Sequence, residues 1–251
     1  MTPHRIGLRT VDEALEQSAA VEGWLTDGQG RRLFAAAARV RAGGCIVELG
    51  SYRGRSTIVI ASAAPPDVEV VAVDPHAGTD RGPLEISGFQ AEAAEDHTVF
   101  MENLRRAGVA DRVRHVRAFS DDAHPAVAGD IDLLYVDAAH RFGPAMRDIS
   151  GWGDRVADGG TMLVHDAFSS VGVTIAILRL LLVGGKFRYV ARSRTLVEYR
   201  ADLARAGLVG RVANVARQLA VLPYFAWNLG LKVVLVLRLG RSSMRAARWP
   251  Y

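Results

Sequence analysis

The chain has 251 residues, 49% of them hydrophobic and 23% charged, a composition typical of a folded globular protein and not of a disordered one. Its single cysteine, Cys45, excludes an internal disulfide and a metal site built on paired cysteines. A lone cysteine fits a reducing compartment, and the N-terminal residues lack the apolar segment of a secretory signal. We therefore expect a cytoplasmic protein.

The charge is distributed unevenly. The formal net charge is +4, but residues 201–251 carry eight arginine or lysine side chains and one acid, Asp202. The other residues are net acidic, so the basic character belongs to the C-terminal tail and says little about the main domain.

Two helices are predicted first, over residues 9–22 and 26–42, with Thr26 or Asp27 as the N-cap of the second. Next come short runs rich in β-branched residues, separated by helical patterns. The runs are 45–49, 68–73, 112–116, 131–136 and 161–165, and the helical patterns are 54–63, 88–107, 143–156 and 171–183. Buried strands that alternate with helices predict a parallel sheet covered by helices on both faces.

Residues 184–200 predict two further strands, which form an antiparallel hairpin at the edge of the sheet. The expected fold class is therefore α/β, with a Rossmann-like sheet of seven mostly parallel strands and a C-terminal apolar and basic helical tail. The predicted divisions are N-terminal helices over 1–42, a main domain over 43–200 and the tail over 201–251.

A glycine turn follows the first predicted strand, in the segment ELGSYRGRS that runs from Glu48 to Ser56. Gly50 and Gly54 allow a tight turn and the close approach of a ligand to the backbone. Their spacing is GxxxG and not GxGxxG, and GxxxxGK[ST] is absent, which argues against a dinucleotide oxidoreductase and an NTPase. A plain strand-to-helix turn is the alternative interpretation.

Acidic and hydroxyl side chains follow the next two strands. Asp74 comes 24 residues after Gly50, and an acid about 20 residues past a glycine turn binds ribose hydroxyls in nucleotide sites. Phe119, Ser120 and Asp121 could stack on a base and hydrogen-bond to it. The alternatives are a capping role for Asp74 and for the Ser-Asp pair.

Four segments, VELGSYRGRS, VVAVDPHAG, IDLLYVDAAH and GGTMLVHD, resemble in this order the class I S-adenosylmethionine-dependent methyltransferases, over roughly residues 30–200. The first segment is similar to the catechol O-methyltransferase type. The pattern of DxxH followed by HD resembles bacterial sugar O-methyltransferases, including the macrolide-sugar and mycobacterial methylmannose polysaccharide types. The resemblance implies that residues 43–200 form a methyltransferase domain that binds S-adenosylmethionine. It implies cofactor contacts from Glu48, Gly50, Ser51, Tyr52, Gly54, Ser56, Asp74, Ser120, Asp121 and Asp137.

Asp137 and Asp166 follow two strands that we expect to be neighbours, so their carboxylates are predicted to meet at the carboxyl edge of the sheet. Hard cations take oxygen ligands, and a metal there would orient an acceptor hydroxyl and lower its pKa. The predicted metal ligands are Asp137, His165 and Asp166. Mg²⁺ is the expected ion, but the nitrogen of His165 would favour Mn²⁺ or Zn²⁺. His165 could instead lie behind the ligands.

His140 stands three residues after Asp137, where the catechol-type pattern has a lysine base. A histidine needs only a small pKa shift to act as a base near neutral pH, and a weakly acidic sugar hydroxyl must lose its proton. A loop histidine without a catalytic role is the alternative.

The expected function is metal-assisted O-methylation of a sugar or glycoside hydroxyl, with S-adenosylmethionine as methyl donor and His140 as general base. The alternatives are a catechol-like or glycolipid acceptor, and a non-catalytic binding or scaffold protein that keeps the fold.

The tail segment 219–239 is apolar but contains Pro223, Asn228, Gly230 and Lys232, which makes it a poor membrane span. It fits either a helix at a membrane interface or a helix buried between subunits. We therefore expect a homo-oligomer, such as a dimer, and alternatively peripheral contact of residues 219–239 with the inner face of the membrane. The apolar content argues against a nucleic-acid partner.

Overall fold

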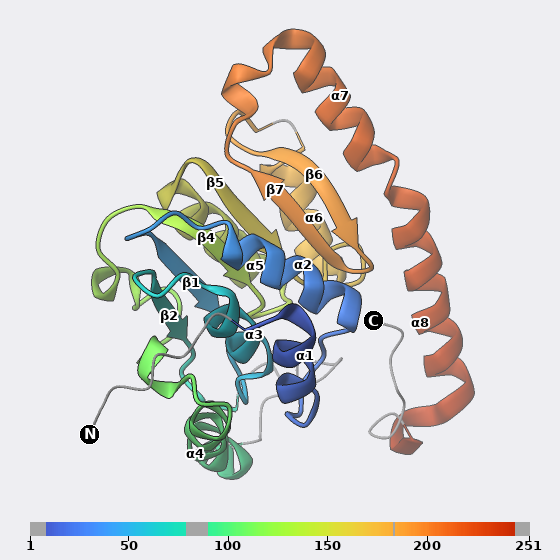
Figure 1. Cartoon of the computed structure of the whole chain (residues 1–251). Coiled ribbons are helices and arrows are strands. Elements are labelled where there is room, and N and C mark those ends of the chain that lie inside the picture. The colour runs from blue at the N-terminus through green and yellow to red at the C-terminus, as the bar shows by residue number, and fades with distance from the viewer. Residues whose placement is uncertain (1–8, 79–89, 183, 244–251) are drawn as a thin grey trace.

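The centre of the protein is a seven-stranded sheet with the strand order β3-β2-β1-β4-β5-β7-β6 (Figure 1). The computed structural model describes residues 9–78, 90–182 and 184–243. β1 to β5 are parallel, and β7 lies antiparallel between β5 and β6. The strands are β1 Cys45–Leu49, β2 Glu69–Val73, β3 Val113–Val116, β4 Ile131–Val136, β5 Val156–Val164, β6 Arg188–Ser193 and β7 Leu196–Arg200. The predicted fold class, with its antiparallel edge hairpin, is confirmed.

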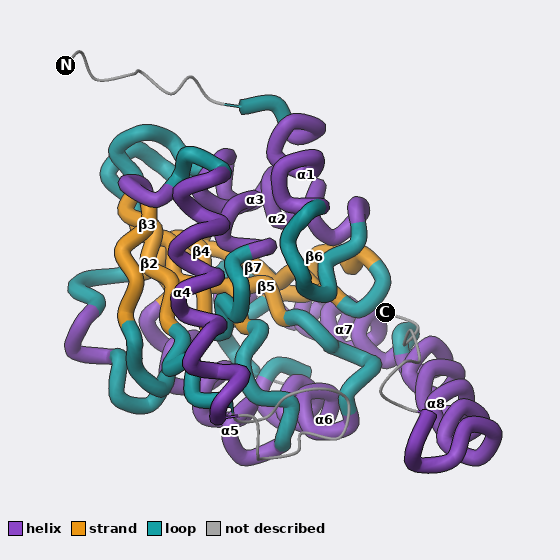
Figure 2. Tube along the Cα trace, turned by 90° about the horizontal axis from the view of Figure 1, so that it is seen from below, coloured by secondary structure: helices purple, strands orange, loops and turns teal. Residues whose placement is uncertain are grey.

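Helices cover both faces of the sheet, as the view from below also shows (Figure 2). All five positions of β1 are buried, which is typical of a central parallel strand. Ile46 packs in one core with α2 and α3, whereas its neighbour Val47 packs in another core with α5 and α6. The helices are α1 Val11–Ala19, α2 Asp27–Ala38, α3 Arg55–Ala63, α4 Gln90–Arg106, α5 Phe142–Arg147, α6 Val171–Leu180, α7 Gly207–Leu219 and α8 Leu222–Ser243.

The helix predicted over residues 143–156 is shorter in the structure. α5 ends at Arg147, and a π-helical turn over Asp148–Trp152 and a 3₁₀ turn over Gly153–Arg155 follow it. β5 then begins at Val156, before its predicted start at residue 161, because Val156 pairs with Ile131 of β4. The glycines within β5 conceal this extension in the sequence.

The tail forms two helices, α7 and α8, which run past the β6 side of the sheet (Figure 1). Proline and glycine both disfavour the interior of a helix, so interruptions at Pro223 and Gly230 would be consistent with the sequence. Instead, the break lies at residues 220–221, and Pro223 occupies the first turn of α8, where its missing N–H is tolerated. α8 continues through Gly230. None of the helices in the described part of the chain is long and apolar enough to cross a membrane.

Both termini of the chain extend beyond what the structure describes. Residues 1–8 of the predicted N-terminal helical division, and residues 244–251 of the predicted tail, lie outside the described residues. The described part of the N-terminal division contains α1 and α2, which both pack against α3.

Gly50 brings the turn after β1 against the end of β4. Its φ is 84°, and a Cβ at this position would lie 2.3 Å from the backbone oxygen of Asp137. The Asp137 N–H donates to the carbonyl of Leu49 at 2.9 Å, so the two backbones remain paired up to this point. A side chain cannot fit between them.

Gly50→Ala is expected to destabilise the protein more than Gly43→Ala does. Gly43 also has a positive φ, 69°, but nothing lies within 4 Å of a Cβ there, so Gly43→Ala isolates the conformational strain, about 1–2 kcal/mol. Gly50→Ala adds a clash with fixed backbone, roughly 1–3 kcal/mol more. Urea unfolding of both variants measures the difference, and equal losses would show that the contact with Asp137 is not tight.

Candidate active site

A cavity of about 1020 Å³ lies at the carboxyl ends of β1, β2, β4 and β5. Ligands bind at this edge in open α/β sheets, and the volume is sufficient for a cofactor together with a small acceptor. Eight of the predicted cofactor residues line it: Gly50, Ser51, Tyr52, Ser56, Asp74, Ser120, Asp121 and Asp137. His140, His165 and Asp166 line it as well.

The two other predicted cofactor residues, Glu48 and Gly54, are not among the lining residues. Gly54 is the N-cap of α3, with a φ of 90°. Glu48 is fully buried and accepts hydrogen bonds from the hydroxyls of Ser56 and Thr57. Burial raises the pKa of Glu48 to about 8, and the two hydrogen bonds oppose this rise. Glu48 therefore joins β1 to the start of α3 beneath the glycine turn.

Asp74 holds the glycine turn in place. Its carboxylate accepts the backbone N–H groups of Ser51 and Tyr52 at 2.9 and 2.7 Å, and that of His76 at 2.8 Å. A carboxylate has about four lone-pair positions, so it can still accept a hydrogen bond from a ligand. Asp74 therefore joins the end of β2 to the turn after β1, and together they form one wall of the cavity.

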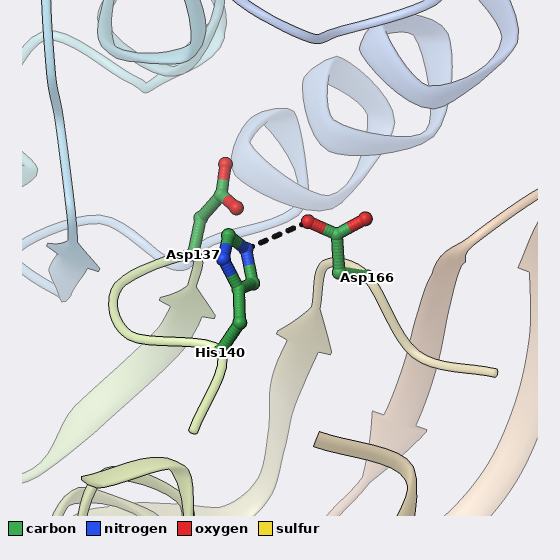
Figure 3. Close-up of side chains that lie close together, drawn as sticks. All are labelled: Asp137, His140 and Asp166. Carbon is green, nitrogen blue, oxygen red and sulfur yellow. Dashed lines mark ion pairs between the residues drawn. The ribbon is translucent and has the colours of Figure 1, made fainter. Parts of the chain in front are cut away.

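Asp137, His140 and Asp166 form a polar cluster on another part of the cavity (Figure 3). Asp137 and His140 come from the loop after β4, and Asp166 follows β5. His140 Nε2 lies 2.7 Å from Asp166 Oδ2, and one ligand atom from each residue lies within 4.8 Å of the others. The hydroxyl of Tyr135 donates to Asp137 Oδ2 at 2.8 Å, which orients this carboxylate.

His165 is buried behind this cluster and bridges its two carboxylates. Its Nδ1 lies 3.2 Å from Asp137 Oδ1 and 3.4 Å from Asp166 Oδ2. Burial lowers the pKa of His165, but attraction to Asp137 and Asp166 outweighs this and raises it well above its usual range. Burial likewise raises the pKa of Asp166, but His165 and His140 outweigh this and hold it well below its usual range.

The cluster has a donor set that fits a divalent cation. Two carboxylates and an imidazole suit ions between hard Mg²⁺ and softer Mn²⁺ or Zn²⁺. Asp166 Oδ1 is buried without a hydrogen-bond partner among the described residues, and a cation would satisfy it. The residue that the geometry groups with the aspartates is His140, whereas the predicted third ligand was His165. The side chain of His165 is 1% exposed, and its Nδ1 lies against the carboxylate oxygens of Asp137 and Asp166.

The backbone of the loop after β5 is strained. Asp166 and Phe168 have φ values of 52° and 57°, in the left-handed region that non-glycine residues rarely adopt. Two side chains of α8 hold this loop. Asn228 Nδ2 donates to the Phe168 carbonyl at 2.9 Å, and Lys232 Nζ donates to the Ser169 carbonyl at 2.9 Å. The tail is therefore part of the support for Asp166.

This role of the tail was not expected from the sequence. Asn228 and Lys232 are four residues apart and so lie on one face of α8. This pair of polar side chains in an otherwise apolar segment was the available signal. The loop after β4 is held as well, because Ser170 Oγ donates to the His140 carbonyl at 3.0 Å.

Most of the residues that line the cavity lie in a segment that matches a known protein family. Residues 47–167 match the family model of a methyltransferase domain. A catechol O-methyltransferase from Mycobacterium tuberculosis is 34% identical over 122 residues, which are 48% of this chain and 46% of that protein. The chain spans about half the length of the curated relatives it matches.

Solved structures share the fold. The cofactor-bound protein Rv0187 from MTB has a TM-score of 0.54 at 23% identity, covering 76% of this chain and 88% of that one. The SAH-bound methyltransferase PaMTH1 from Podospora anserina has a TM-score of 0.56 at 16% identity, with 76% and 87% covered. Residues 47–167 are therefore similar to a methyltransferase domain, and the solved structures share the fold of the chain.

Glu48→Gln is expected to stabilise the protein increasingly as the pH rises. The pKa of Glu48 rises from an ordinary 4.5 to about 8 on folding, so the folded wild type binds the extra proton and loses stability as the pH rises between these values. Glutamine keeps a hydrogen-bond acceptor and cannot ionise. The melting temperature of the variant relative to wild type should therefore increase from about pH 5 to about pH 9. A difference that does not change with pH would contradict this.

Asn228→Ala is expected to loosen the loop after β5. The Phe168 carbonyl loses its buried donor, at a local cost of about 1–3 kcal/mol. The N–H groups of Ser169 and Ser170, which donate to the Asp166 carbonyl, should then exchange with solvent faster. Hydrogen exchange of a peptide covering this loop measures the effect. Trp227→Ala, on the exposed side of the same helix, is the control. Equal exchange in the two variants would mean that α8 does not hold the loop.

Proposed function

We propose that the protein is an O-methyltransferase that transfers the methyl group of S-adenosylmethionine to a hydroxyl of a sugar or glycoside, with His140 as general base and a divalent cation assisting. The observation that carries the proposal is the pair formed by His140 and Asp166, at 2.7 Å, in the same cavity as the glycine turn.

The pair has the properties of a base and its orienting carboxylate. The side chain of Asp166 is 9% exposed, whereas that of His140 is 29% exposed and reachable from the cavity. A buried carboxylate fixes the ring of a histidine and stabilises the imidazolium that forms. An imidazole nitrogen of His140 would take the proton of the acceptor hydroxyl as the new C–O bond forms.

S-adenosylmethionine, when bound, supplies an electrophilic methyl group, whose C–S bond breaks as the C–O bond forms. We assign the ribose to Asp74, the adenine end to Ser120 and Asp121, and the amino-acid end to the turn at Gly50 and Ser51. The hydroxyl of Ser51 supports this assignment, since it is buried at the cavity without a hydrogen-bond partner among the described residues.

Asp137 and Asp166 would hold the cation, with Mg²⁺ as the first candidate and Mn²⁺ as the second. A cation bound there would lower the pKa of the acceptor hydroxyl. A nitrogen of His140 that binds the cation cannot also accept a proton, so the roles of base and ligand exclude each other at that atom. In this proposal His165, which bridges both carboxylates, orients them instead of binding the ion.

The walls near the cluster support an acceptor with both polar and apolar parts. Arg141 and Lys232 line the cavity together with the apolar side chains of Phe142, Val171 and Leu229. Hydroxyls of a sugar suit the charged groups, and an apolar aglycone suits the other side chains. A catechol-type acceptor is the second candidate, because the 34% identical relative is a catechol O-methyltransferase.

His140→Ala is expected to lower the rate of methyl transfer by about 10²–10⁴-fold while the affinity for S-adenosylmethionine stays within about twofold, because only proton removal is lost. Calorimetric titration measures cofactor binding. Transfer of labelled methyl groups to a panel of glycosides and catechols measures the rate, with and without added imidazole, which should partly restore the activity of the variant.

Chelation of divalent cations should lower the rate in wild type, and Mg²⁺ or Mn²⁺ should restore it in wild type but not in Asp137→Ala. An unchanged rate in His140→Ala would show that His140 is not the general base, while the proposed methyltransferase activity would stand. Failure of the wild-type protein to bind S-adenosylmethionine would overturn the whole proposal.

A further inference from the structure

The two tail helices expose a concentration of large apolar side chains. Eight of the fourteen large hydrophobic residues that are exposed in the described part of the chain lie on α7 and α8. The most exposed are Leu208, Val209 and Val212 on α7 and Trp227 and Val233 on α8, at 78%, 85%, 61%, 71% and 50%. Concentrated exposure of this kind marks an interaction surface, in contrast to scattered single residues.

Trp227, Val233 and Val234 form an outer face of α8 that is separate from its contacts with the sheet domain. Trp227 and Val234 are seven residues apart and lie on the same side of the helix. Asn228, 5% exposed, and Lys232 face inward and hold the loop after β5. The outer face therefore has no role in supporting the cavity.

The charged side chains that the structure describes on α7 and α8 are all basic. Arg211 and Arg217 are exposed on α7, and Asp202 is the last acid in the sequence. Apolar side chains flanked by arginines, with no carboxylate among them, are complementary to the interface of an anionic lipid bilayer. Two copies of these helices would pair poorly across a two-fold axis, because neither copy has an acidic residue on α7 or α8 to pair with the arginines of the other.

We propose that the exposed apolar and basic side chains of α7 and α8 bind peripherally to the surface of a membrane that contains anionic lipid, without crossing it. This binding goes beyond the proposed methyl transfer and does not depend on it. Leu229 and Lys232 of α8 also line the cavity, so the membrane would lie beside the part of the cavity that we assign to the acceptor. An acceptor carrying an apolar anchor would reach the cavity from the bilayer.

The test is sedimentation of the full chain with vesicles of phosphatidylcholine, alone or mixed with phosphatidylglycerol. Wild type should bind the anionic vesicles at least about tenfold more strongly than the neutral ones, and added salt should weaken the binding. Two variants should each lose at least about tenfold of the anionic binding: one with Leu208→Ser, Val209→Ser and Trp227→Ser, and one with Arg211→Ser and Arg217→Ser.

Val190→Ser is the control, because Val190 is an exposed apolar residue on β6, outside the tail. It should bind like wild type, and unchanged melting temperatures should show that all variants are folded. Absence of vesicle binding by the wild-type chain, or equal binding by wild type and both tail variants, would overturn the proposal. A wild-type dimer in sedimentation equilibrium that dissociates in the apolar variant, without vesicle binding, would assign the face to a second copy instead.

Discussion

The buried negative charge of Asp166 is the constraint on which the rest of the candidate site depends. A buried carboxylate is costly, by several kcal/mol, unless cationic partners and hydrogen bonds compensate it. Here the compensation comes from His165, its neighbour in sequence, and from His140, on the loop after β4. His165 is shared with Asp137, so neutralising one charge also positions the second carboxylate. The ends of β4 and β5 are thereby joined by electrostatics as well as by their backbone pairing.

This compensation requires a loop conformation that is unfavourable by itself. Non-glycine residues with a positive φ cost of order 1–3 kcal/mol each, and the loop after β5 contains two, Asp166 and Phe168. Hydrogen bonds from Asn228 and Lys232 oppose this strain. The predicted boundary near residue 200 marks a change in composition, but these two contacts cross it. The loop after β5 therefore depends on the tail for part of its stability.

The parts of the structure that could be predicted are those that depend on local pattern. Buried β-branched runs such as β1 and β4 identify central strands, and the rule that parallel strands end at one edge predicts that Asp137 and Asp166 meet. The start of β5 could not be predicted, because Gly159 and Gly160 lie within the strand and weaken its β pattern.

The choice between two histidines for one cluster could not be predicted either. In the sequence His165 is adjacent to Asp166 and His140 stands three residues after Asp137, and only the direction of each side chain decides which one groups with the two aspartates. Glu48 raises the same difficulty: its position in the turn motif implies a ligand contact, whereas its side chain faces the start of α3. Tertiary contacts of α8 with a loop 60 residues earlier are likewise beyond any local pattern.

The order of these elements along the chain has a consequence for biosynthesis. A ribosome releases the chain from its N-terminus, and the last strand of the sheet ends at Arg200, before α7 and α8 are made. A nascent chain can therefore complete the sheet while the donors that secure the loop after β5 are still unsynthesised. The strained loop that carries Asp166 is then stabilised only when residues 228 and 232 emerge, so the cavity matures last, after the sheet that carries it.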